Sequence, residues 1–357
     1  MRGSRAAPAL LLGFILLTQG NCSKKPNEAS PSAATAPSSI ETPGVDLRVF
    51  AEPGEDAPIS DIAADSTSHH VVAVSRKGKK IGAWHIPSGV WSWKHHLVQQ
   101  PGLLAIHPVT GEGVLVWQKD RGAELLRFRP ATGETVGRVD LGASGAQEFL
   151  TAAFDTDRNR VFLTTTSGIF CVDLTANRLS PAGPHALLLP FVQALDLAID
   201  PATQTALVAH AGAGITLLDL TLWGRFGMEI PSTEIPLPPH AQTPSGVAID
   251  SEQGRGYALA GSQWFEIDLN TRQIARRAAV QPERNFAGGR IVFAGSCGRL
   301  YVACGDLAEV NLDTGAWRSI SRLDGCPAPV VSAPFVGALF LIQQGRLSSP
   351  LTICSPY

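Results

Sequence analysis

One short phrase recurs along this 357-residue chain at a nearly constant interval, and this repeat restricts the possible folds more than any other feature of the sequence. Six copies, aligned on the residue that precedes a turn, are separated by 43 to 49 residues. The aligned residues are His85, Arg129, Asp173, Asp219, Asp268 and Asn311. A period of this length is typical of propellers and other repeat architectures.

A second pattern precedes each copy by about 20 residues, and an apolar run lies between the two. It occupies residues 62–65, 104–107, 152–155, 197–200, 247–250 and 291–294. Each unit of about 45 residues therefore offers four short strands joined by turns, which is typical of a β-propeller blade. Asp, Asn, Thr and Gly fill the turns because they tolerate the required backbone angles and form local hydrogen bonds.

The sequence thus predicts an all-β chain, a β-propeller of seven four-stranded blades. Six units are clear, and residues 329–355 offer up to three more strands. An N-terminal strand at 45–50 is expected to complete the last blade, which would close the ring and leave no open sheet edge. Six blades are the alternative.

The unit LYVACGDLAEVNLDTG (300–315) resembles the YVTN-type, WD40-like repeat of bacterial β-propellers. The resemblance covers most of 60–355. It implies the architecture and not the activity, since such propellers include enzymes, binding modules and scaffolds.

The N-terminal segment has the pattern of an export signal. Arg2 and Arg5 precede an apolar run at 9–17 that is too short to span a bilayer, and the sequence TQGNC follows. A cysteine directly after such a run resembles a bacterial lipoprotein signal, which implies lipidation of Cys22. The alternative is cleavage after Gly20, which would give a soluble periplasmic or secreted protein.

Three segments follow from this pattern. Residues 1–22 are expected to be the signal peptide, and 46–357 the propeller domain. Between them, 23–45 are rich in Ser, Ala, Pro and Thr, and are expected to form a flexible tether. The chain is therefore placed in the cell envelope, as a periplasmic or outer-membrane lipoprotein whose lipid anchor binds the membrane.

Basic residues are distributed unevenly. The net charge is −2, which suggests no nucleic-acid partner, yet all five lysines that follow the tether fall within 77–119. They are expected in turns and loops of the first two blades, on the face where propeller ligands gather, with Lys94 in a loop between blades. The candidate anion site consists of Arg76, Lys77, Lys79, Lys80, Lys94, Lys119 and Arg121. The alternative is that these side chains only solvate exposed turns.

Two stretches resemble the β-propeller phytases. These are EDAPISDIAAD with VVAVSRKGKKIGAWHI (55–65 and 71–86), and FVGALFLIQQG (335–345). The resemblance implies calcium-dependent hydrolysis of a phosphomonoester, which requires clustered carboxylates. Gln344 replaces the aspartate of that family, and the stretch at 208–214 has no carboxylate where the family has an acidic turn.

Six cysteines are present, and an exported protein can oxidise them. Cys297 and Cys304 are expected at opposite ends of one strand, about 23 Å apart, which is too far for a disulfide. Cys304–Cys326 is the preferred bridge, and Cys326–Cys354 is the alternative. Cys171 is expected to be a buried thiol.

The sequence favours a non-catalytic binding or scaffold module whose partner is an envelope protein or a small anionic ligand. Enzymatic activity is left open, with a phytase-like, calcium-dependent phosphatase as the alternative. No cofactor or metal site is assigned, because the pairs His69–His70 and His95–His96 lack evident further ligands.

Overall fold

The computed structural model describes residues 58–352 with the exception of several short segments. These segments are 120–121, 143–147, 181–192, 213, 224–229, 280–288, 295–297, 305, 323–329, 334–337, 344–345 and 348–350. The chain divides into two units, Met1–Glu41 and Thr42–Tyr357, and every described residue belongs to the second. Several expectations from the sequence therefore fall outside the described residues. They are the signal peptide, the lipidated Cys22, the tether and the strand at 45–50.

The described residues form short antiparallel strands, together with the 3-10 helix η2 (Leu220–Leu222). Blade 1 contains β1 (Asp61–Asp65), β2 (His70–Ser75), β3 (Lys80–His85) and β4 (Val90–His96). Blade 2 contains β5 (Pro101–Ile106), β6 (Gly113–Gln118), β7 (Ala123–Phe128) and β8 (Thr135–Asp140). Blade 3 contains β9 (Phe149–Asp155), β10 (Arg160–Thr165), β11 (Gly168–Asp173) and β12 (Arg178–Leu179).

Three further blades follow in the same order. Blade 4 contains β13 (Ala194–Asp200), β14 (Thr205–His210), β15 (Gly214–Asp219) and β16 (Ser232–Pro236). Blade 5 contains β17 (Pro244–Asp250), β18 (Arg255–Ala260), β19 (Gln263–Asp268) and β20 (Gln273–Ala279). Blade 6 contains β21 (Arg290–Ala294), β22 (Arg299–Cys304), β23 (Asp306–Asn311) and β24 (Trp317–Arg322). The last sheet contains β25 (Val330–Ala333), β26 (Ala338–Gln343), β27 (Arg346–Leu347) and β28 (Leu351–Thr352).

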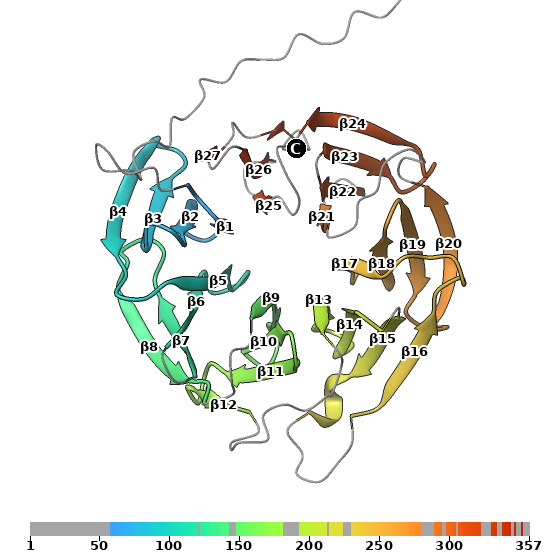
Figure 1. Ribbon diagram of the computed structural model, residues 1–357, viewed down its shortest axis with the longest axis horizontal. Coiled ribbons are helices and arrows are strands. Elements are labelled where there is room, and N and C mark those ends of the chain that lie inside the picture. The colour runs from blue at the N-terminus through green and yellow to red at the C-terminus, as the bar shows by residue number, and fades with distance from the viewer. Residues whose placement is uncertain are drawn as a thin grey trace, which may run out of the picture. The chain divides into compact units, whose positions relative to one another are not determined.

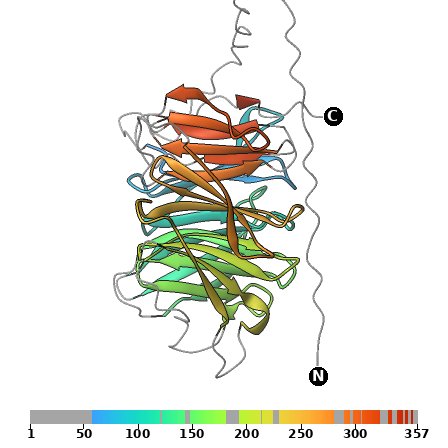
Figure 2. The ribbon, with the colours of Figure 1, turned by 90° about the vertical axis from the view of Figure 1, so that its right-hand side faces the viewer.

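The sheets are arranged in a ring, as the sequence predicts for a β-propeller (Figure 1). The first strand of each sheet is innermost and contacts the first strand of the next, from β1 through β5, β9, β13, β17 and β21 to β25. Contacts of β25 with β1 close the ring. In the side view the strands run between the two faces of the ring, so the turns lie on one face or the other (Figure 2).

The number of complete blades differs from the first expectation. The described residues form six complete four-stranded blades, which was the alternative to seven. In the last sheet, β27 pairs with Ile342–Gln343 of β26, and β28 pairs with Ala338–Leu339 of the same strand. Because β25 occupies the other edge of β26, these two short strands together fill one strand position. The sheet therefore has three positions, and the strand expected to complete it lies outside the described residues.

The turns that define the sequence repeat have a common cause. Asp173 and Asp268, at the ends of third strands, accept hydrogen bonds from backbone N–H groups two or three residues later. Asn311 does the same at the end of β23. Such Asx turns reverse the chain without any long-range partner, which is why they are visible in the sequence. The expectation that these residues precede a turn is confirmed.

The core lies between neighbouring blades and is formed mainly by the second and third strands. Val72 and Val74 of blade 1 pack with Leu115 of blade 2, and all three side chains are fully or almost fully buried. Strand positions alternate between the two faces of a blade, so each blade packs against both neighbours. Cys171 is one of these core residues and is completely buried, as expected.

Two aspartates on innermost strands tie neighbouring blades together. Asp61 of β1 accepts hydrogen bonds from the N–H of Ile62 and, across the junction, from that of Leu104 (3.2 Å). Asp196 of β13 is bound in the same way, by the N–H of Leu197 and by that of Val247 in blade 5 (2.9 Å).

Arg290, on the innermost strand of blade 6, supports these carboxylates. It donates to the carbonyl of Leu150 in blade 3 at 3.1 Å, and so links two blades that are not neighbours. Burial raises the pKa of both Asp61 and Asp196, and the charge of Arg290 is the largest effect that opposes this rise in each case. Asp61, Asp196 and Arg290 therefore form a polar cluster on the innermost strands of the ring.

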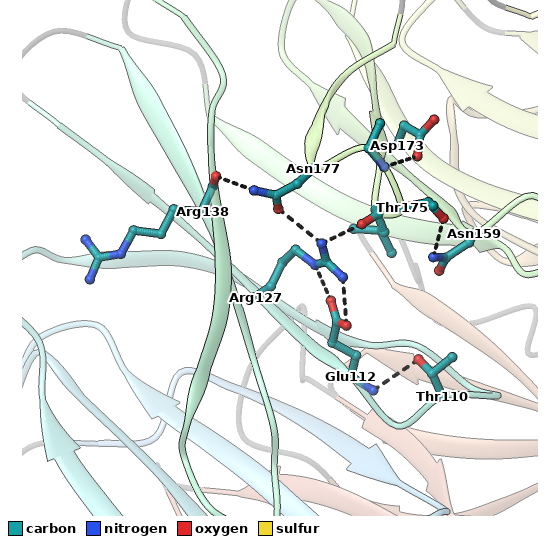
Figure 3. Close-up of polar contacts among 10 residues, drawn as sticks. Thr110, Glu112, Arg127, Arg138, Asn159, Asp173, Thr175 and Asn177 are labelled. Atoms are coloured by element: carbon teal, nitrogen blue, oxygen red, sulfur yellow. Dashed lines mark hydrogen bonds and ion pairs between the residues drawn. The ribbon is translucent and has the colours of Figure 1, made fainter.

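A different tie joins blades 2 and 3 near their outer strands. Arg127 of β7 forms an ion pair with both carboxylate oxygens of Glu112, and it also donates to the carbonyl of Leu174 and to Oδ1 of Asn177. Asn177 donates in turn to the carbonyl of Arg138 (Figure 3). The network provides acceptors for the hydrogen-bond donors of the guanidinium on several sides, and it fixes the β11–β12 turn against blade 2.

Candidate functional site

Two hollows lie beside blade 2, and they share Trp117 and Lys119 as lining residues. The outer one is formed by blades 1 and 2, and the inner one is also bordered by Glu148 and Phe149 at the start of blade 3. The inner hollow has a volume of about 520 Å³, and the outer hollow about 570 Å³. Both volumes fall in the range of roughly 300–1,000 Å³ that is typical of small-molecule sites. We call the two hollows together the inter-blade cleft.

The inner hollow is lined by polar side chains from the turns between strands. Arg76 belongs to the β2–β3 turn, Gln118 and Lys119 lie at the end of β6 and just after it, and Gln100 precedes β5. Glu148, before β9, is the one carboxylate among the lining residues described. Two cations and one acid give the lining of the inner hollow a formal charge of +1 at neutral pH.

The guanidinium of Arg76 is held at the wall of the inner hollow. Its Nη2 donates to the carbonyl of Gly102, and its backbone N–H donates to Oγ of Ser60 at 3.0 Å. Its Nε is buried and has no hydrogen-bond partner among the described residues. Arg76 also lowers the pKa of the buried Asp61 carboxyl, although burial and the charge of Arg290 have larger effects. Part of the charge of Arg76 is therefore balanced by Asp61.

A chain of polar contacts fixes the residues that the two hollows share. Trp117 and Glu124 face each other across β6 and β7, and the indole Nε1 donates to Glu124 Oε2 at 3.2 Å. Lys119 Nζ lies 2.8 Å from the same oxygen. The guanidinium of Arg138, on β8, lies 6.0 Å from the centre of the Trp117 ring and forms no ion pair with a described residue.

Trp93 of blade 1 forms the opposite wall of the outer hollow. Its Nε1 donates to the carbonyl of Pro130 at 2.5 Å, and its ring meets Phe128 edge to face. His95 stacks on it with ring centres 5.1 Å apart. A Cβ atom at Gly133 would lie 2.9 Å from both His95 Nε2 and Trp93 Cδ2, so only glycine fits this close approach. The indole is therefore held on three sides.

The structure brings together only part of the predicted anion site. Arg76 and Lys119 line the inner hollow, whereas Lys77 and Lys79 are exposed in the β2–β3 turn and line neither hollow. Arg121 lies outside the described residues.

Lys80 and Lys94 lie elsewhere than the sequence indicated. Lys94 was expected in a loop but belongs to strand β4, where Lys94 pairs with Gly82 and its ammonium lies 5.3 Å from the centre of the Trp91 ring. Lys80 begins β3 and is only 6% exposed. Burial lowers the pKa of Lys94, and the charge of Lys80 lowers it further.

The pleat of blade 1 separates these two lysines from the outer hollow. Lys80 and Lys94 occupy alternate register positions to Ile81 and His95, which line that hollow. Because neighbouring positions on a strand point to opposite faces, the two lysines belong to the other face of the blade. The predicted basic sector is thus divided between two faces.

The polar cluster of Asp61, Asp196 and Arg290 was not predicted from the sequence. One signal was available, because both aspartates directly precede the second repeat pattern, at 62–65 and 197–200. Among the described residues, no group of three or more His, Cys, Asp or Glu side chains could hold a metal ion. The preferred disulfide would join Cys304 to Cys326, and Cys326 and the side chain of Cys304 lie outside the described part of the chain.

No protein-family model matches this chain, and a search of curated proteins finds no significant match. The described residues contain no helix that is long and apolar enough to cross a membrane.

Proposed function

We propose that this chain is a non-catalytic binding propeller of the cell envelope, and that it binds a small anionic ligand in the inter-blade cleft. The observation that carries the proposal is the position of Arg76 at the wall of the inner hollow. Lys119 lines the same hollow, so two cationic side chains from blades 1 and 2 face it. A guanidinium at the wall of a hollow is suited to a carboxylate or phosphate, which accepts charge-assisted hydrogen bonds.

The charge around the cleft supports an anion over a cation. Arg76, Lys119 and Arg138 line the two hollows, whereas the carboxylates among the lining residues are Glu124 and Glu148. Glu124 is already bound to Lys119 and to the indole of Trp117. A cation at Glu124 would have to displace Lys119, and Glu148 is the one other carboxylate among the described lining residues, against the three cations Arg76, Lys119 and Arg138.

Calorimetric titration of the full chain with inorganic phosphate and with succinate tests the proposal. Arg76→Gln should weaken binding of the preferred anion by about tenfold or more, since a charged hydrogen bond contributes about 1.5–3 kcal/mol. Lys119→Gln should weaken it less, because Glu124 already shares that charge. Arg129→Gln is the matched control, because this arginine is exposed, is paired with Glu134, and lines neither hollow.

Two results would overturn the proposal. One is equal affinity in Arg76→Gln and Arg129→Gln, which would show that the inner hollow does not bind the anion. The other is calcium-dependent release of phosphate from a phosphomonoester, which would replace a binding module with the phytase-like hydrolase that residues 55–86 and 335–345 resemble. The assay therefore includes phenyl phosphate with and without calcium.

The envelope location forms a separate part of the proposal. We infer from the sequence of residues 1–22 that a lipid on Cys22 anchors the propeller to a membrane. Radiolabelled palmitate should be incorporated into the wild-type chain in a bacterial host but not into Cys22→Ser, and the variant should appear in the soluble fraction. A wild-type chain without label would favour cleavage after Gly20 and soluble export.

A further inference from the structure

The outer hollow has walls of a different kind from the inner one. Two indoles line it, Trp93 from blade 1 and Trp117 from blade 2, and the side chains of Leu97, Leu126 and Phe128 add apolar surface. The polar groups of this hollow lie beside the rings, with Lys119 and Glu124 at Trp117. A hollow with aromatic walls and a few placed polar groups is the usual form of a site for a ring-bearing small molecule.

Both indoles are fixed before any ligand arrives. Trp93 is held by its hydrogen bond to Pro130, by the stacked His95 and by the close approach of Gly133. Trp117 is held through Glu124. A side chain that is already ordered loses little conformational entropy when a ligand packs on it, so these rings would bind a flat partner at low cost.

The rim of the outer hollow carries an apolar side chain that nothing in the described chain covers. Val98, directly after β4, is 92% exposed and lines the hollow. The other large aliphatic side chains that are strongly exposed among the described residues are Val90, Val109 and Val136, and they too belong to blades 1 and 2. A ligand that filled the outer hollow would cover part of Val98.

We propose that the ligand of the inter-blade cleft is an aromatic anion. Its ring lies in the outer hollow against Trp93 and Trp117, and its charged group lies in the inner hollow at Arg76 and Lys119. Lys119 lines both hollows and so stands where the two parts of the ligand meet. This inference rests on the proposed anion site and adds the chemical class of the ligand. It assigns Trp93 the role of selecting an aromatic ring over an aliphatic one.

Three probe ligands distinguish the contribution of the ring to binding affinity from that of the charged group. Inorganic phosphate, cyclohexyl phosphate and phenyl phosphate carry the same anionic group, and the last two have rings of similar size. We expect phenyl phosphate to bind about three- to tenfold more tightly than cyclohexyl phosphate, which is the range that aromatic pairing adds beyond burial of area. Inorganic phosphate should bind most weakly, and each affinity is measured by calorimetry on the full chain.

Variants then test whether Trp93 causes the preference for phenyl phosphate over cyclohexyl phosphate. Trp93→Leu should remove the difference between phenyl and cyclohexyl phosphate. Trp91→Leu is the matched control, since Trp91 lies on the same strand but contacts Lys94 and lines neither hollow. His95→Ala is a second variant for the case that Trp93→Leu fails to fold, because His95 is exposed and stacks on Trp93. It should reduce the preference by at least half.

The outcomes distinguish this inference from the function on which it rests. If the phosphates bind and Arg76→Gln weakens them, but phenyl and cyclohexyl phosphate bind equally, the aromatic class is wrong and the anion site stands. A preference that survives in both Trp93→Leu and His95→Ala would also overturn the role given to this wall. Absence of binding by all three probes would overturn both the anion site and the aromatic class.

Discussion

Arg127 allows a sharp test of a buried charge at a junction of blades, because it pairs with Glu112 within blade 2 and also donates to blade 3. The two side chains are only 11% and 18% exposed, and the guanidinium also donates to Leu174 and Asn177 of blade 3 (Figure 3). In Arg127→Met the carboxylate of Glu112 would remain between the blades without its partner. The substitution keeps an unbranched apolar side chain in place of the aliphatic part of the arginine, so its main effect is the loss of charge and of hydrogen bonds.

The size of the effect follows from burial. Removing one partner of a buried ion pair costs about 3–5 kcal/mol, because the remaining charge is left without compensation. Glu112 is slightly exposed and can recover some hydration, which places the expected loss near the lower limit, at about 3 kcal/mol. For a domain of this size the loss corresponds to a decrease of about 6 °C in Tm. Thermal unfolding followed by circular dichroism measures it.

Blade 2 supplies its own control. Arg129 and Glu134 also form an ion pair, but their side chains are 66% and 61% exposed. Exposed pairs contribute about 0–1 kcal/mol, so Arg129→Met should change Tm by no more than about 2 °C. The double variant Glu112→Met with Arg127→Met should recover at least half of the loss, since it leaves no buried charge. Equal effects of Arg127→Met and Arg129→Met would refute this reasoning.

Three further predictions concern pH, packing and reactivity. Burial raises the pKa of Asp61 and Asp196 in the folded state above the ordinary 3.8. The stabilisation linked to their protonation is therefore complete below pH 3.8 and is lost as pH rises through the folded-state pKa. In urea titrations, the stability of the wild type relative to the double variant Asp61→Asn with Asp196→Asn should increase from pH 7 to pH 4.5. Gly113→Ala places a Cβ 2.3 Å from the Phe128 ring and should cost about 2 kcal/mol, partly restored by adding Phe128→Leu, as measured by the same titrations. The Cys171 thiol is buried, which raises its pKa, so peptide mapping should find it alkylated by iodoacetamide only after unfolding.

The sequence was most informative where the determinants are local. Asp173 and Asp268 mark turns through hydrogen bonds to residues two or three positions later, so the repeat could be found without knowledge of any distant contact. The apolar runs of second and third strands, such as 71–74, are buried on both faces and are equally visible. These two features were sufficient to predict the propeller and its four-stranded blades.

Outermost strands were harder to recognise. The second half of β4, from Trp93 to His96, is mostly exposed, so it lacks the apolar run of an inner strand, and its polar residues suggested a loop. The irregular register beside Ala83 and Trp84 further disturbs the alternation of side chains. For this reason the placement of Lys94 was wrong, and the lysines were assumed to share one sector.

The polar cluster of the inner ring depends on closure of the whole chain. Asp61, Asp196 and Arg290 are separated by many repeats, and only the ring brings Arg290 into the range of both carboxylates. The inter-blade cleft has the same origin, because its walls come from blades 1, 2 and 3 and the contacts that shape it are largely between side chains. A sequence repeat predicts that blades are neighbours, but it does not predict which side chains meet at a given junction.

The junction between blades 1 and 2 is tied on both sides of the cleft, and this bears on how a ligand could enter. On the inner side the carboxylate of Asp61 binds the N–H of Leu104, and on the outer side the indole of Trp93 binds the carbonyl of Pro130. Opening the junction would break both contacts and expose the core formed by Val72, Val74 and Leu115, so the two blades should behave as one rigid wall. A ligand must therefore fit the hollows as they stand. That condition favours a compact, flat molecule and explains why shape, and not charge alone, should determine which anion this propeller binds.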